Sequence, residues 1–228
     1  MQAPRVDDAA RALARLAAQP DPSVEEMALA IAAAFRDAPV DAAAVARLLD
    51  ELAAEVRPAV VAAAGDPSAE AGALAEVLGR RHGFAGDRED YDAPRNSFLD
   101  VVLERRRGLP ILLSVLWLSM AGRTGVELVG VGLPGHFVVA HVGAAPPILL
   151  DPFDGGRPYA GAAPAVLPIA TPHDIALRML GNLALAYERR GDPVRALRAA
   201  RLRLLLPTGG ALREQLEQDA LRLGAPFN

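Results

Sequence analysis

The 228-residue chain contains no cysteine and no lysine, and only 4% of its residues are aromatic. Without cysteine the chain has no thiolate nucleophile, no disulfide and no cysteine-ligated metal centre. Without lysine it has no side-chain amine for Schiff-base chemistry. Any chemistry must therefore use serine, histidine, the carboxylates or arginine.

A long hydrophobic run is also missing. The longest apolar stretch, residues 109–122, has 14 residues, whereas a membrane-spanning helix needs about 20. The polar start of the sequence, residues 1–10, contains no apolar segment of the kind found in a secretory signal. We therefore expect a cytoplasmic protein with no membrane span.

The charge is unevenly distributed although the net charge is only −4. Residues 1–90 carry 16 acidic side chains and 9 arginines, whereas residues 174–206 carry 3 and 7. This asymmetry either steers a partner or draws the two ends of the chain together. The sequence pI of about 5.6 and the absence of a recognition motif argue against a nucleic-acid partner.

Cofactor and metal signals are weak. No phosphate-binding glycine loop or dinucleotide fingerprint is present, so we expect no cofactor. His136 and His141 are five positions apart, which places them on opposite faces of a strand, and His82 and His173 are isolated. We therefore expect no metal site.

Residues 6–82 have apolar side chains at three- and four-residue spacing, which predicts a helical scaffold with breaks at residues 19–23 and 65–68. A further helix is predicted to start at Ser97, with Asp100 completing a capping box, and to stop at Gly108. Pro110 then suits the first turn of a buried central helix that ends before Gly125.

Three valine-rich stretches follow, at residues 128–133, 137–142 and 148–153, and predict a small antiparallel sheet. If the last two form a hairpin, residue 136 or 138 faces Asp151, depending on the register. Either register places His136 and Asp151 on one face of the sheet.

The chain returns to a helical pattern from residue 172. Residues 180–207 resemble a single tetratricopeptide helix pair with its closing proline. Because such repeats need several copies to be stable alone, we expect this pair to pack against the rest of the chain.

A glycine that begins a helix, a strand with histidine and a neighbouring strand with aspartate form the layout of a papain-like or transglutaminase-like active site. Four motifs occur in that order: NSFL at 96–99, RGLPILLS at 107–114, GLPGHF at 132–137 and LDPFDGG at 150–156. Together they resemble the SirB family of transglutaminase-like proteins. The resemblance implies a helical start, a transglutaminase-like core and a tetratricopeptide-like tail.

The sequence departs from active transglutaminases at the nucleophile. Those enzymes place a cysteine two residues after a glycine, at the first turn of the buried helix, where the helix dipole favours thiolate. Counted from Gly108, that position holds Pro110. Ser114 lies one turn further along and is the alternative nucleophile, although a serine in an apolar helix commonly bonds a backbone carbonyl.

The candidate catalytic residues are therefore His136, Asp151 and Ser114. The residues expected to line the retained cleft and bind a ligand are Asn96, Arg107, Pro110, Phe153 and Asp154. Each has a structural alternative. Asn96 suits a helix cap, the three consecutive arginines at 105–107 suit a solvated helix end, and residues 151–156 suit a turn.

These observations predict an α+β protein with a helical region at 1–82, a transglutaminase-like core with a small antiparallel sheet at 83–170 and a helical tail at 171–228. The first hypothesis is a pseudoenzyme that binds a protein or peptide in its retained cleft. The second is an amide or ester hydrolase in which Ser114 attacks, His136 is the general base and Asp151 orients the imidazole. The third is an adaptor acting through its helical tail. The sequence does not predict the oligomeric state.

Overall fold

The computed structural model describes residues 6–227 and shows an α+β protein. Its packing separates the chain into two compact units. The first contains the described residues up to Val40, Asp92–Phe98 and those from Thr171 onward, and the second contains Asp41–Tyr91 and Leu99–Ala170. The three-segment division of the sequence stays a prediction, since these units are defined by packing.

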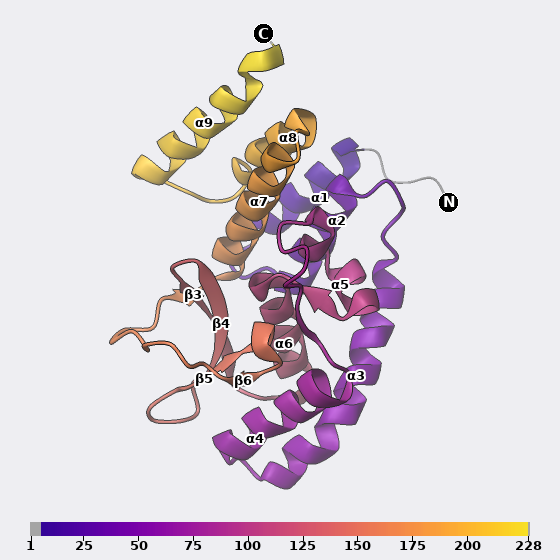
Figure 1. Cartoon of the computed structure of the whole chain (residues 1–228), viewed down its shortest axis with the longest axis vertical. Helices are drawn as coiled ribbons and strands as arrows, with labels where there is room; N and C mark the ends of the chain where they lie inside the picture. Colours follow the sequence, from indigo (N-terminus) through magenta and orange to yellow (C-terminus); the bar gives the residue numbers. More distant parts are fainter. Residues whose placement is uncertain (1–5, 228) are drawn as a thin grey trace. The chain divides into compact units, whose positions relative to one another are not determined.

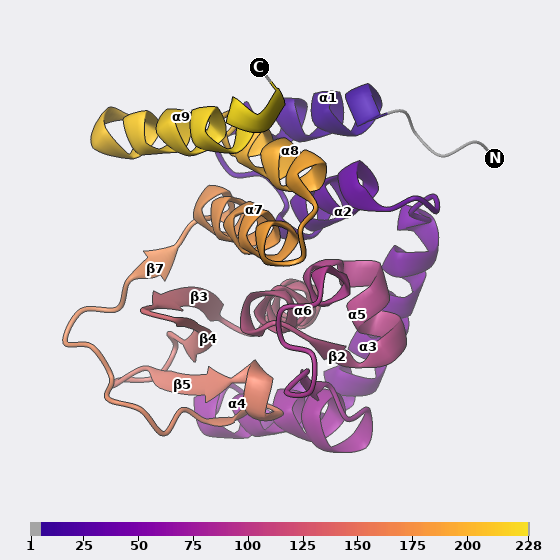
Figure 2. The ribbon, with the colours of Figure 1, turned by 45° about the horizontal axis from the view of Figure 1, so that its top comes forward.

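The first unit is helical (Figures 1 and 2). Its elements are α1 (Val6–Ala17), α2 (Val24–Phe35), the short 3-10 helix η2 (Pro94–Ser97), α7 (Pro172–Arg189), α8 (Pro193–Arg203), α9 (Gly210–Gly224) and η4 (Ala225–Phe227). Successive pairs pack together: α1 on α2, α2 on α7, α7 on α8 and α8 on α9. The α7–α8 pair occupies the predicted tetratricopeptide-like segment, and its repeat character stays a prediction.

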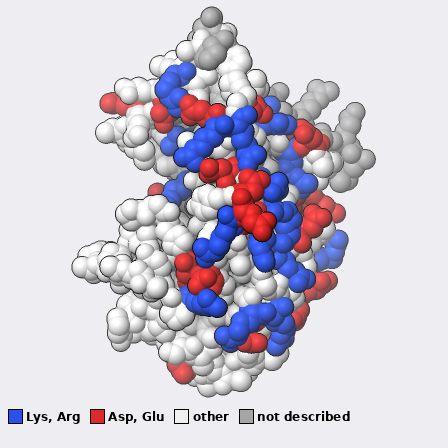
Figure 3. All heavy atoms as spheres, viewed as in Figure 1, with Lys and Arg blue, Asp and Glu red and all other residues white. Residues whose placement is uncertain are grey.

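Polar side chains start these helices where the sequence predicts a break. Ser23 accepts a hydrogen bond from the Glu26 N–H at 3.3 Å and caps α2. Arg195 of α8 pairs with Asp37 at 3.0 Å, so opposite charges from the two ends of the chain do meet within this unit. On the face shown in Figure 3, arginine and acidic side chains are interleaved.

The helices of the second unit surround one buried helix. The buried helix is α6 (Pro110–Thr124), and the others are α3 (Ala42–Ala63), α4 (Pro67–Leu74), the π-helix η1 (Ala75–Arg81), α5 (Leu99–Arg105) and a short 3-10 helix after the sheet strand β5 (Ile148–Asp151). α6 begins at Pro110 and ends at Gly125 in the left-handed conformation, φ 82°, as predicted. It packs against α3, α5 and the strands β3 (Leu128–Leu133) and β4 (His136–His141), so it is the central helix that the sequence predicts.

The second unit also holds a five-stranded antiparallel sheet, in the order β6 (Arg157–Pro158), β5 (Ile148–Asp151), β4 (His136–His141), β3 (Leu128–Leu133) and β7 (Ile169–Ala170). Val139 pairs with Leu150, which makes Val138 the residue across from Asp151. His136 lies two residues from Val138 and therefore on the same face. The prediction that His136 and Asp151 share a face is confirmed.

The two faces of this sheet have different coverings. On the face of His136 and Asp151, Val131, Val138 and Ala140 form an apolar cluster with Tyr159 and Leu167 of the irregular segment after β6. The opposite face carries Val139 and Leu150. α6 packs on β3 and β4, and α4 packs on β5.

Two predicted boundaries are wrong. Ser97 does not cap a helix, because its buried hydroxyl has no hydrogen-bond partner among residues 6–227, and α5 begins at Leu99. α5 ends at Arg105 rather than at Gly108 because Arg106 takes a left-handed conformation, φ 57°. The chain then forms β2 (Arg107–Gly108), which pairs in parallel with β1 (Ala85–Gly86).

The last predicted strand is also shorter than expected. β5 ends at Asp151, and Pro152 starts the 3-10 helix η3 (Pro152–Asp154). Proline has no N–H for the strand ladder, which explains the stop. None of the helices formed by residues 6–227 has both the length and the apolar character needed to cross a membrane.

Candidate functional site

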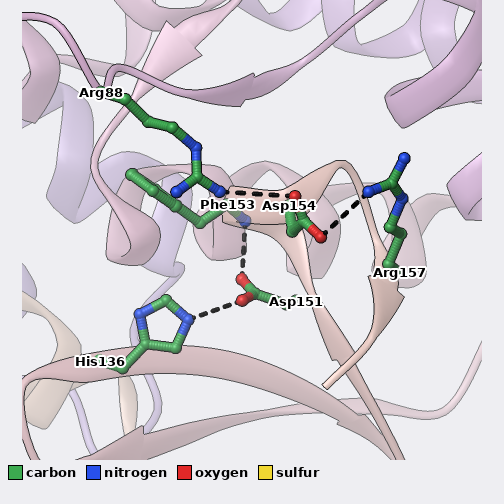
Figure 4. A network of polar contacts seen from close by, with 6 residues as sticks. All are labelled: Arg88, His136, Asp151, Phe153, Asp154 and Arg157. Atoms are coloured by element: carbon green, nitrogen blue, oxygen red, sulfur yellow. Dashed lines mark hydrogen bonds and ion pairs between the residues drawn. The ribbon is translucent and has the colours of Figure 1, made fainter. Parts of the chain in front are cut away.

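His136 and Asp151 form a hydrogen-bonded dyad at one end of the sheet (Figure 4). The Nε2 of His136 lies 2.9 Å from Oδ2 of Asp151. The other carboxylate oxygen, Oδ1, accepts the backbone N–H of Phe153 at 2.9 Å. Both oxygens of Asp151 are therefore engaged, which fixes the carboxylate and, through it, the orientation of the imidazole.

Aromatic rings enclose the dyad. Tyr159 stacks on His136 with ring centroids 6.0 Å apart and planes at 21°, and Phe153 meets His136 edge to face at 6.2 Å. Tyr91 in turn contacts Phe153 at 5.8 Å. The His136 side chain nevertheless keeps 24% of its surface exposed. The imidazole is thus oriented by its neighbours and still reachable by a ligand.

The ring of Phe153 packs against the backbone of Gly86 in β1, close to the start of α6. A Cβ added at Gly86 would lie 2.2 Å from the Phe153 ring, so only glycine allows this approach. Gly86 pairs with Gly108, two residues before Pro110. The β1–β2 pair thus connects the start of α6 to the aromatic ring that touches His136.

A charged network borders the dyad (Figure 4). Asp154 contacts Arg88 at 3.4 Å and Arg157 at 3.5 Å. The Arg88 guanidinium also lies over the Phe153 ring, 5.0 Å from its centroid. The predicted binding residues Phe153 and Asp154 are therefore near the dyad, and their binding role stays a prediction.

The position of the missing nucleophile is filled by packing. Pro110 is buried at the first position of α6, where its ring suits the helix start. Ser114, one turn on, is fully buried, and its hydroxyl has no hydrogen-bond partner among the residues described. The Ser114–His136 hydrogen bond that the hydrolase hypothesis requires is absent.

Two other predicted binding residues lie elsewhere. Arg107 in β2 donates to the carbonyl oxygens of Gly83 at 2.6 Å and Arg106 at 2.9 Å, so its guanidinium braces the backbone around β1 and β2. Asn96 is buried in η2, which belongs to the first unit. Their proposed roles as ligand contacts stay predictions.

A second histidine–carboxylate pair lies on the opposite face of β4. His141 Nε2 is 2.9 Å from Oε2 of Glu70 in α4, and its Nδ1 accepts the Gly143 N–H at 3.2 Å. Because Nδ1 is an acceptor, the ring proton of the neutral imidazole is on Nε2 and points to Glu70. The His141 side chain is only 2% exposed, so this pair is part of the core.

Sequence reasoning did not identify Arg88, Tyr91, Arg157 or Tyr159 as neighbours of the dyad. Arg88 and Asp154 are 66 positions apart, and no local pattern joins them. The chain has only three tyrosines, and two of them, Tyr91 and Tyr159, lie near the dyad. Their rarity in the sequence was the one signal that could have pointed to them. Among residues 6–227 no group of three or more His, Asp or Glu side chains is arranged to hold a metal ion.

Comparisons with known proteins agree with this architecture. The family model described as "Transglutaminase-like superfamily" matches residues 43–167, more than half of the chain, and spans nearly all elements of the second unit. No solved structure shows a significant match to the chain.

Relatives of the chain include proteins named "UPF0162 protein". The one from Pseudomonas aeruginosa is 35% identical over 213 residues, which cover 85% of this chain and 76% of the relative. The one from Xylella fastidiosa (strain Temecula1) is 36% identical over 155 residues, 59% of this chain, and the match spans about half of its length, 55%. "F-box only protein 21" of Homo sapiens is 41% identical over 71 residues, 31% of this chain and 11% of that protein. The chain therefore belongs to the transglutaminase-like superfamily and to the family of UPF0162 proteins.

Proposed function

We propose that this protein is a non-catalytic member of its superfamily that binds a peptide or protein segment at the His136–Asp151 dyad. The supporting observation is an oriented, partly exposed imidazole in a chain without cysteine. Proline occupies the helix position from which a thiolate would attack. The oriented histidine then serves to donate or accept a hydrogen bond with a bound partner.

The surroundings of the dyad suit a peptide ligand. Phe153, Tyr159 and Tyr91 provide apolar ring surface, and Arg88 provides a cation beside it. Aromatic residues and arginine are the side chains that dominate binding energy in protein interfaces. No cofactor is required for such a role.

The serine hydrolase is the weaker candidate because of Ser114. A serine nucleophile needs its hydroxyl within about 3 Å of the base that activates it. The Ser114 hydroxyl is buried and has no such partner among residues 6–227. We therefore assign Ser114 to helix packing.

The test is peptide selection followed by a variant comparison. Peptides selected from a random display library on the full chain are titrated against the wild type and His136→Ala. We expect the affinity to fall at least tenfold, which is about 1.4 kcal/mol, because the ligand loses its hydrogen bond to the imidazole.

The matched control is His82→Ala. His82 is also paired with a carboxylate, Glu55 at 3.1 Å, and has a comparable exposure of 20%. This variant should bind the selected peptides as the wild type does. Equal affinity of the wild type and His136→Ala for every selected peptide would contradict the proposal.

A further inference from the structure

A groove of about 630 Å³ lies in the second unit between α4 with η1 and the β5–β6 edge of the sheet. Small side chains form one wall, including Ala71, Gly72 and Ala75. Ile148 and Leu150 of β5 form the other. This volume is in the range of ordinary ligand sites.

The groove is distinct from the dyad. Successive side chains of a strand point to opposite faces, so Leu150 faces the groove whereas Asp151 faces His136. Neither His136 nor Asp151 lines the groove. A ligand in the groove and a ligand on the dyad would lie on opposite faces of β5.

Two glycines of the helical wall shape the groove: Gly72 leaves it open, and Gly79 allows a close backbone contact that closes one end. A Cβ added at Gly72 would meet no atom within 4 Å, so the wall there borders open space. At Gly79 the helix instead touches the turn after η3, where a Cβ would lie 1.9 Å from the Gly155 carbonyl oxygen. The result is a hollow along the helix with a floor of small residues.

The rim carries an excess of arginine. Arg80 and Arg157 line the groove, and Arg88 reaches Asp154, which also lines it. Among residues 6–227, the carboxylates that form ion pairs with these three arginines are Asp154 and Glu76. Arg88 and Arg157 remain 67% and 77% exposed.

The arginine contacts with Asp154 are weak. Distances of 3.4 and 3.5 Å exceed the 2.7–2.9 Å typical of a charge-assisted hydrogen bond. One carboxylate thus serves two guanidinium groups loosely, and each can turn to another carboxylate. Arginine is well suited to this because its planar fork can bind a carboxylate in bidentate fashion.

We propose that this groove is a second binding site, which takes an extended acidic peptide segment of another protein. Small apolar side chains of the peptide lie between α4 and β5, and its carboxylates bind Arg157 or Arg80. Pro158 has no N–H, so recognition uses side chains rather than addition of a strand to β6.

The probes are two short fluorescein-labelled peptide pools with alanine, valine and leucine, one also carrying glutamate and the other lysine. Fluorescence anisotropy with the full chain should show binding of the glutamate pool and little of the lysine pool. Binding should weaken as salt is added, because exposed charges are screened. No binding of the glutamate pool, or equal binding of both pools, overturns the proposal.

Two pairs of variants locate the site. Gly72→Leu fills the groove, and its control is Gly122→Leu, another exposed helical glycine whose added Cβ meets nothing within 4 Å. Arg157→Glu reverses the rim charge, and its control is Arg11→Glu, an exposed arginine with the same i,i+3 pairing. We expect at least a tenfold loss of affinity for each groove variant and none for the controls.

His136→Ala should leave binding of the glutamate pool unchanged, which separates this site from the dyad. If Gly72→Leu and Arg157→Glu both bind like the wild type, the groove is not the site and the proposal fails. Fluorescence of the single tryptophan, Trp117, buried in α6, confirms that the second unit is folded in each variant there. For Arg11→Glu, which lies in the first unit, far-ultraviolet circular dichroism reports the helical content.

Discussion

The two faces of strand β4 each carry a histidine–carboxylate pair with the same nitrogen–oxygen distance, and the two pairs differ in how far the histidine is exposed. His136–Asp151 and His141–Glu70 both join Nε2 to a carboxylate oxygen at 2.9 Å. The first histidine is 24% exposed and the second only 2%. Pairing alone therefore does not mark a functional site, and accessibility to a ligand is what separates the two.

The buried pair should matter most for stability. In His141→Ala, the Glu70 carboxylate, whose side chain is only 15% exposed, loses its partner, and the Gly143 N–H loses its acceptor. We expect the free energy of unfolding to fall by about 3 kcal/mol. Urea unfolding followed by Trp117 fluorescence reports on the second unit, because that tryptophan is buried there.

Two controls sharpen this comparison. Glu70→Gln keeps an oxygen that accepts from His141 and should cost less than His141→Ala. His136→Ala should cost under about 1 kcal/mol, because water can reach Asp151 after the change. Equal losses in His136→Ala and His141→Ala would show that the contrast between the two faces is wrong.

For a third pair, His82–Glu55, we expect removal of the histidine to have the smallest effect on the free energy of unfolding, because the carboxylate is exposed. The hydrogen bond from His82 is the main cause that lowers the pKa of Glu55, the charges of His82 and Arg81 act in the same direction, and burial opposes them. A lowered pKa contributes stability above the ordinary glutamate value, and this is lost as the pH falls through the lowered value. The contribution is about 0.3 kcal/mol for an exposed pair.

Carboxyl NMR titration of Glu55 tests this last pair. In His82→Ala the pKa of Glu55 should rise toward its ordinary value, and the acid side of the stability profile should flatten slightly. An unchanged pKa in this variant would mean that the His82 hydrogen bond does not set it.

The sequence predicted what depends on short-range periodicity. Alternation along a strand placed His136 and Asp151 on one face and His141 on the other, and Pro110 and Gly125 predicted the limits of α6. These features follow from backbone geometry over a few residues. The α+β core is therefore readable from one sequence.

Contacts between distant segments were beyond that reasoning. Glu70 and His141 are 71 positions apart, and only the packing of α4 on β5 brings them together. The groove beside α4 also results from the packing of α4 on β5, so the sequence pattern did not predict it. The early end of α5 was also missed, because pairing of β2 with β1 overrides the helical pattern near Arg106.

The most direct test of a dyad without a nucleophile is covalent labelling. The full chain is treated with serine-directed acylating and phosphonylating probes, and the intact mass of the wild type is compared with those of Ser114→Ala and His136→Ala. The account predicts that the folded wild type gains no mass. Stoichiometric labelling of the wild type that disappears in both variants would contradict it and establish a serine enzyme.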